Sequence, residues 1–60
     1  MMDKLPNDPV MLLSVINMKL RDQYTDLDAL CEGMNVEKEF LINKFSTIDY
    51  SYDEECNQFV

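Results

Sequence analysis

The sequence is poor in the residue types on which most catalytic and metal-binding sites depend. It contains no histidine and only two cysteines, Cys31 and Cys56, which stand far apart and outside any Cys-x-x-Cys pattern. A zinc site needs at least three good ligands close together, and a cysteine nucleophile needs an adjacent base. Paired carboxylates could still act as acid and base, but 60 residues hardly offer a pocket to perturb them. We therefore predict that the protein is not an enzyme and uses no metal, cofactor or small-molecule substrate.

Long apolar runs are also missing. The longest, Val10–Leu13 and Phe40–Ile42, are far too short to cross a membrane. The first residues, Met1–Asn7, lack the basic-then-apolar order of a signal peptide. We therefore expect a cytoplasmic protein without membrane contact, in which both cysteines are reduced thiols.

Basic residues are scarce: five Lys and Arg stand against twelve Asp and Glu, for a net charge of −7. Residues 1–24 carry three charges of each sign and are neutral, residues 25–48 carry five acids and two bases (net −3), and residues 49–60 carry four acids and no base (net −4). Such a chain repels polyphosphate and anionic lipid. The acidic run Asp53-Glu54-Glu55 lacks the alternating ligands and central glycine of an EF-hand, so we interpret it as solvated surface.

Hydrophobic residues make up 47% of the chain, which is enough for one small domain over residues 1–60. Asp8 followed by Pro9 is a strong helix start, because Asp8 can accept from the first turn and Pro9 loses no needed donor. Apolar residues at helical spacing after this point indicate an inward face. The predicted core residues are Leu13, Ile16, Leu20, Leu30, Leu41 and Phe45.

Two further helices are marked by capping signals. Thr25 and Asp28 resemble a capping box, and Gly33, the only glycine, suits a left-handed cap at the end of the second helix. Asn35 is expected to cap the third helix. The predicted fold is an all-α trihelical domain with helices over 9–22, 26–32 and 36–47, followed by an ordered non-helical tail over 49–60.

The second and third helices have the spacing of a helix-turn-helix. Cys31 is the small residue where the helices cross, Asn35 stands where glycine is usual, and Leu41 points inward. Met34 and Val36 form the apolar pair that brackets the turn. Trihelical domains that never touch DNA share this spacing, so the pattern alone does not define a function.

The residues at the start of the third helix argue against DNA. A recognition helix needs Arg, Lys, Asn or Gln at outward positions, whereas this one begins with Glu37, Lys38 and Glu39. A protein-binding or structural use of the motif is therefore favoured. A nucleic-acid-binding helix-turn-helix regulator is the alternative hypothesis. A third hypothesis is an acidic mimic that occupies the nucleic-acid site of another protein.

The tail carries three aromatic residues, Tyr50, Tyr52 and Phe59. They would form either a binding patch or a lid that closes the small core, and we favour the core, with all three folded back on the helices. Asn17 borders the inward stripe of the first helix. Its predicted role is structural, through a hydrogen bond to backbone nearby.

The first helix has a second apolar stripe, formed by Met11, Val15 and Met18, roughly opposite the core stripe. A helix that is apolar nearly all round must be covered on more than one side, here by the tail or by another chain. Both alternatives remain open. We take these three residues as a candidate protein contact, for a partner protein or a homodimer. The leading hypothesis is thus a non-enzymatic protein-interaction or self-association module.

A set of short blocks forms a specific pattern along nearly the whole chain: Leu5-Pro-x-Asp-Pro9, Met11-Leu-Leu-Ser14, Asn17, Leu20-Arg-Asp22, Leu30-Cys31, Tyr50-x-Tyr52 and Asn57-x-Phe59. With this pattern the chain resembles the short bacterial proteins of domain-of-unknown-function family 4250. Those proteins have glycine before the first tyrosine, where this chain has Asp49. The resemblance implies a small bacterial cytoplasmic protein and transfers no activity, because the family has none assigned.

We predict no measurable binding to duplex DNA at physiological salt. The net charge of −7 and the carboxylates of Glu37 and Glu39 would face phosphates. An electrophoretic shift assay with genomic fragments measures this. Specific sub-micromolar binding that weakens steeply with salt would contradict the prediction.

Overall fold

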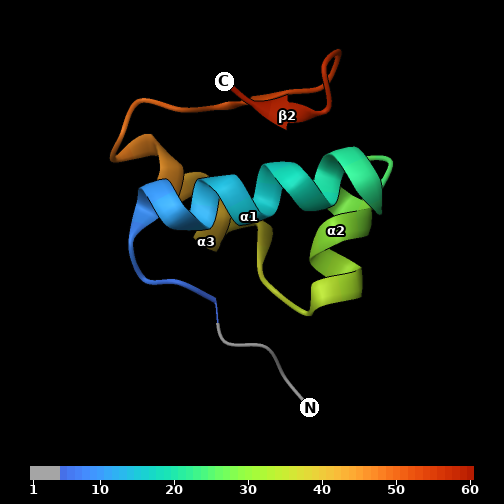
Figure 1. Cartoon of the computed structure of the whole chain (residues 1–60), viewed down its shortest axis with the longest axis horizontal. Helices are drawn as coiled ribbons and strands as arrows, with labels where there is room; N and C mark the ends of the chain where they lie inside the picture. The colour runs from blue at the N-terminus through green and yellow to red at the C-terminus, as the bar shows by residue number, and fades with distance from the viewer. Residues whose placement is uncertain (1–4) are drawn as a thin grey trace.

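The structure, a computed structural model, describes residues 5–60 of the chain. Within this range the helices are α1 (Pro9–Asp22), α2 (Leu27–Met34) and α3 (Lys38–Ser46), and the strands are β1 (Tyr52–Asp53) and β2 (Gln58–Phe59). The chain is mostly helical, but the predicted all-α class leaves out the tail, which forms a two-stranded antiparallel hairpin with Tyr52 opposite Phe59. Figure 1 shows α1 in the middle of the molecule, and it contacts α2, α3 and β2.

The first helix has the predicted bounds, because its start is fixed locally. The Asp8 carboxylate accepts a hydrogen bond from the Met11 N–H at 3.1 Å, and Pro9 occupies the first turn. Lys19 and Arg21 lie in the last turn, where their positive charges interact favourably with the negative end of the helix dipole.

The core contains all six of the predicted residues, together with Leu12, Leu27 and Phe59. Phe59, next to the last residue, is only 1% exposed. Its ring packs edge-on against Phe45 with ring centroids 4.6 Å apart. Burying one Phe contributes about 1.5–3 kcal/mol. The tail is therefore part of the core.

The amino end of α2 is capped by a different residue from the predicted one. The Asp26 carboxylate, rather than Thr25, accepts from the Ala29 N–H at 2.7 Å. The helix consequently begins at Leu27 instead of residue 26. Asp28, predicted as the reciprocal half of a capping box, instead pairs with Lys38.

The carboxyl end of α2 lies two residues beyond the predicted end, at Met34 instead of residue 32. The predicted left-handed cap, Gly33, lies inside the helix, and Asn35 takes that conformation with φ 57°. Gly33 instead lies against the ring of Tyr24, and a Cβ there would be 2.5 Å from that ring unless the tyrosine side chain shifted. The single glycine thus makes room for an aromatic ring rather than for a turn.

The third helix is shorter than predicted at both ends, spanning Lys38–Ser46 instead of 36–47. Asn35 terminates α2 and so cannot also cap α3. Glu37 takes the capping position, and among the described residues its side chain makes no capping hydrogen bond.

Asp49, three residues after the end of α3, takes the left-handed conformation, with φ 65°. The Tyr50 N–H donates to the Phe45 carbonyl at 2.9 Å, and the Asp49 N–H donates to the Ser46 carbonyl at 3.2 Å. These two bonds form a Schellman motif, in which this position usually holds glycine. The chain therefore keeps a tight turn there although it carries aspartate.

The hairpin is fastened to the α1–α2 link by one pair of polar side chains. The Tyr52 hydroxyl donates to the Asn57 side-chain oxygen at 2.6 Å and accepts from the Leu27 N–H at 3.2 Å. The Asn57 amide donates to the carbonyls of Leu20 and Tyr24 at 3.0 and 3.1 Å. These groups sit at the end of one helix and the start of the next, where helices lack internal partners. We call the Tyr52–Asn57 pair the clasp.

Asn17 fastens β2 directly to α1. Its side-chain oxygen accepts from the Phe59 N–H at 2.8 Å, and its amide donates to the Phe59 carbonyl at 3.2 Å. The predicted structural role is confirmed, but the backbone partner is 42 residues away instead of nearby. The inward folding of the tail aromatics is confirmed for Phe59 and for half-buried Tyr52, which packs against it, and is wrong for Tyr50, which is 38% exposed.

We predict that Asp49→Gly stabilises the protein by about 0.5–1 kcal/mol. A residue with a side chain pays about 1–2 kcal/mol to adopt the left-handed conformation, and glycine avoids this strain. Part of the gain is lost because glycine gives the unfolded chain more conformational entropy. Urea unfolding measures the difference. Asp22→Gly at the end of α1, where the backbone is helical, serves as the control and should destabilise. An Asp49→Gly variant less stable than the parent would contradict the prediction.

Candidate functional site

The predicted contact residues lie on the outward side of α1. Met11 is 60% exposed and Met18 is 49% exposed, whereas Val15 between them is half-buried. Met11 and Met18 are seven residues apart, nearly two helical turns, and so project in similar directions. We call these three residues the α1 face.

The tail leaves Met11 and Met18 of the α1 face exposed. The hairpin meets α1 at Asn17 and Leu20, which lie toward the core side of the helix, and leaves Met11 and Met18 exposed. Of the two alternatives for covering the stripe, burial of these two methionines by the tail is therefore wrong. Val10, 58% exposed, is a further exposed apolar residue of α1.

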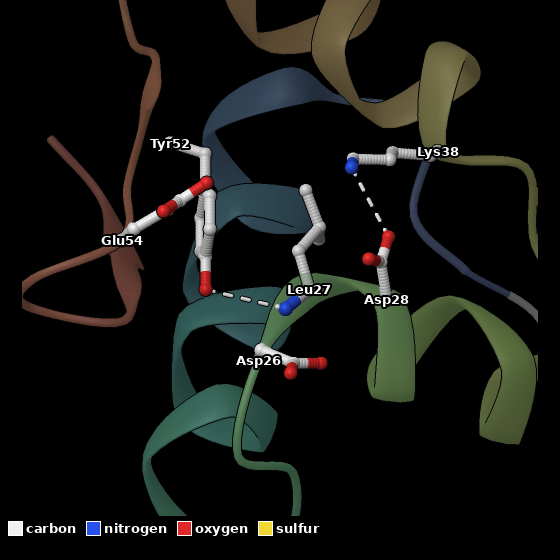
Figure 2. Close-up of a pocket in the computed structure, with 6 residues that line it drawn as sticks. All are labelled: Asp26, Leu27, Asp28, Lys38, Tyr52 and Glu54. Carbon is white, nitrogen blue, oxygen red and sulfur yellow. Dashed lines mark hydrogen bonds and ion pairs between the residues drawn. The ribbon is translucent and has the colours of Figure 1, made fainter.

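A second surface feature is an open hollow of about 290 Å³ between the start of α2, the start of α3 and the hairpin. Figure 2 shows the Tyr52 hydroxyl directed at the Leu27 N–H on one side and Lys38 reaching Asp28 on the other. Three acids and one base line it. The full lining is Asp26, Leu27, Asp28, Lys38, Tyr52 and Glu54.

The polar groups of the hollow hold the fold together. The Lys38 ammonium lies 3.0 Å from the Asp28 carboxylate, whose hydrogen bond and charge raise the pKa of Lys38. Asp26 caps α2, and Tyr52 belongs to the clasp. Within residues 5–60, no group of three or more His, Cys, Asp or Glu side chains is placed to hold a metal ion. The polar side chains of Asp26, Asp28, Lys38 and Tyr52 therefore already have structural partners within the chain.

The cysteines sit in surroundings that disfavour the reactive thiolate. In the described part of the chain Cys31 and Cys56 are free thiols. Partial burial and then the charge of Asp28 raise the pKa of Cys31, and the charge of Asp53 raises the pKa of Cys56. A nucleophilic cysteine needs the opposite shift, toward the thiolate.

The outward surface of α3, the would-be recognition helix, is apolar and acidic. Phe40 is 48% exposed, and Lys44 lies over its ring with the ammonium 5.9 Å from the ring centroid. The charge of Lys38 is paired with Asp28. This leaves Glu37 and Glu39 as the exposed charges at the start of the helix.

The sequence did not predict the hydrogen bonds made by the Asn57 side chain and the Tyr52 hydroxyl. The Asn57-x-Phe59 block contained the signal, because asparagine favours left-handed turns and Asn57 has φ 55°. Its contacts with Leu20 and Tyr24 could not be inferred, since they join residues more than 30 positions apart.

Fold and surfaces together define a small, mainly helical domain closed by a C-terminal hairpin, with exposed apolar side chains on α1 and on α3. The family described as Domain of unknown function (DUF4250) matches residues 6–59, and the chain belongs to this family. No curated protein and no solved structure is significantly similar to the chain. In residues 5–60, no helix has the length and apolar character needed to span a bilayer.

We predict that the clasp makes the protein sensitive to alkali. Burial raises the pKa of Tyr52 despite the opposing Leu27 N–H bond, so above about pH 10, the ordinary tyrosine pKa, the folded chain holds a proton that the unfolded chain has lost. The stability that this group contributes is present below that pH and falls as the pH rises through the raised pKa.

Tyr52→Phe should cost about 1–3 kcal/mol at neutral pH, because the Leu27 N–H and the Asn57 oxygen lose their partner. It should also flatten the loss of stability as the pH rises above about 10. Urea unfolding at a series of pH values measures both effects. Tyr50→Phe, at an exposed tyrosine, is the control. Equal alkaline loss in the parent and Tyr52→Phe would contradict the prediction.

Proposed function

We propose that the chain is a non-enzymatic protein-contact module of the bacterial cytoplasm, and that the α1 face is its contact surface. The observation that carries the proposal is the exposure of Met11 and Met18 on one side of a helix whose other side forms the core. Exposed apolar patches on soluble proteins mark contact sites when they are contiguous. Methionine suits such a site because its unbranched, polarisable side chain adapts to different surfaces.

The exposure is not forced on the chain by the fold. The inward stripe of α1 is complete with Leu12, Leu13, Ile16 and Leu20, so polar residues at positions 11 and 18 would leave the core intact. The two methionines are thus best explained by a contact made outside the chain.

The helix-turn-helix-like arrangement of α2 and α3 serves in this proposal as scaffold. Asn35 takes the left-handed turn position, and Leu41 is fully buried, in keeping with that arrangement. The outward charges at the start of α3 are the acids Glu37 and Glu39, whereas residues 1–24 carry no net charge. A contact with another macromolecule is therefore favoured at α1 over α3. The raised pKa values of both cysteine thiols, and the ion pair of Lys38 with Asp28 in the hollow, support a non-catalytic function.

Site-specific photocrosslinking in the cells that produce the protein tests the proposal. Benzoylphenylalanine replaces Met18 in one variant and Phe40, which has nearly the same exposure, in the control. We expect light-dependent protein adducts from position 18 and few or none from position 40. An absence of adducts at position 18, or equal adducts at both positions, would overturn the proposal.

A further inference from the structure

We infer that the occupant of the α1 face is a second copy of this chain, packed with its α1 antiparallel to the first about a two-fold axis. The inference rests on the proposed function of the α1 face and names its partner. Three observations lead to it: the distribution of charge over the molecule, the charges at the two ends of α1, and the positions of the two methionines.

The charge distribution directs two copies to α1. Among the described residues, 5–24 carry two acids and two bases, whereas 25–60 carry nine acids and two bases. The whole net charge of −7 therefore lies in the second part of the chain. Two identical acidic molecules repel each other through every surface dominated by that part. The neutral helix is where they approach at the least electrostatic cost.

The ends of α1 favour antiparallel over parallel pairing. The amino end carries Asp8, a charge of −1, and the last turn carries Lys19, Arg21 and Asp22, a net +1. In a parallel pair like ends meet. In an antiparallel pair each acidic end lies beside a basic one, and the helix dipoles also oppose each other favourably. The helix is thus electrostatically self-complementary in one orientation.

The methionines fit the same symmetry. The midpoint between Met11 and Met18 falls between Ser14 and Val15, close to the middle of the fourteen-residue helix. A two-fold axis through this point places Met11 of one copy beside Met18 of the partner subunit, and the reverse. A two-fold contact of this kind uses the same patch on both copies and closes on itself, so it yields a dimer and no chain of molecules.

The size of the face sets the expected strength. The accessible surface of the chain is 4393 Å², and a standard interface would need about 800 Å² of it per partner. A helix of fourteen residues is about 21 Å long and offers less than this. The dimer should therefore be weak, with a Kd in the range of about 10 μM to 1 mM.

Sedimentation equilibrium of the purified full chain at up to about 2 mM tests the dimer, since this concentration exceeds the expected Kd range. Met18→Glu should weaken association at least about tenfold, because it places a charge in the apolar contact. Phe40→Glu is the matched control, with the same charge change at nearly the same exposure. A parent that stays monomeric, or equal weakening by both substitutions, would overturn the inference. Circular dichroism establishes that each variant is folded.

A second pair of variants tests the orientation. Lys19→Glu and Lys44→Glu both reverse a base in the last turn of a helix and change the net charge equally, from −7 to −9. Lys19 is chosen because Arg21 already pairs with Asp22 at 3.1 Å. Antiparallel pairing predicts that Lys19→Glu weakens the dimer more than Lys44→Glu, because the altered end then faces Asp8 of the partner subunit. Equal effects would overturn the antiparallel arrangement.

The outcomes separate the inference from the function on which it rests. If the purified chain is monomeric but position 18 crosslinks to a different protein in cells, the self-dimer is wrong and the contact module stands. If position 18 crosslinks to nothing, both are wrong. A crosslink between two copies of the chain, together with a concentration-dependent dimer lost in Met18→Glu, supports both.

Discussion

The structure depends on the burial of Phe59, because this residue completes the core and yet lies one position from the end of the chain. Its ring meets Phe45, but its backbone N–H and carbonyl must also find partners when they leave water. Asn17 supplies both partners from the middle of α1, as a neighbouring strand would. One side-chain amide thus lets a two-residue strand dock on a helix.

The clasp extends the same principle to the link between α1 and α2. Asn57 bonds two carbonyls at the end of α1, and Tyr52 receives the first N–H of α2 while donating to Asn57. Groups that helix termini leave without partners are therefore satisfied by the hairpin. The hairpin consequently approaches α1 from the side of Asn17 and Leu20, and this placement leaves Met11 and Met18 exposed. The candidate contact surface is a consequence of how the core is closed.

Much of the fold follows from local signals. Asp8 and Pro9 fixed the start of α1, and the apolar spacing identified Leu41, Phe45 and the inward face of α1 as core. The errors occur where two residues compete for one role. Asp26 rather than Thr25 caps α2, and Asn35 rather than Gly33 takes the left-handed turn at its end.

The sequence by itself determined the helical class, the bounds of α1, the uneven charge and the composition of the α1 face, because these depend on neighbouring residues and on helical periodicity. Only the tertiary structure decided that Asn17 pairs with Phe59, that Tyr50 stays outside while Tyr52 turns inward, and that the tail leaves Met11 and Met18 uncovered. These outcomes depend on contacts between the first and last thirds of the chain, for which local propensity and periodicity carry no information.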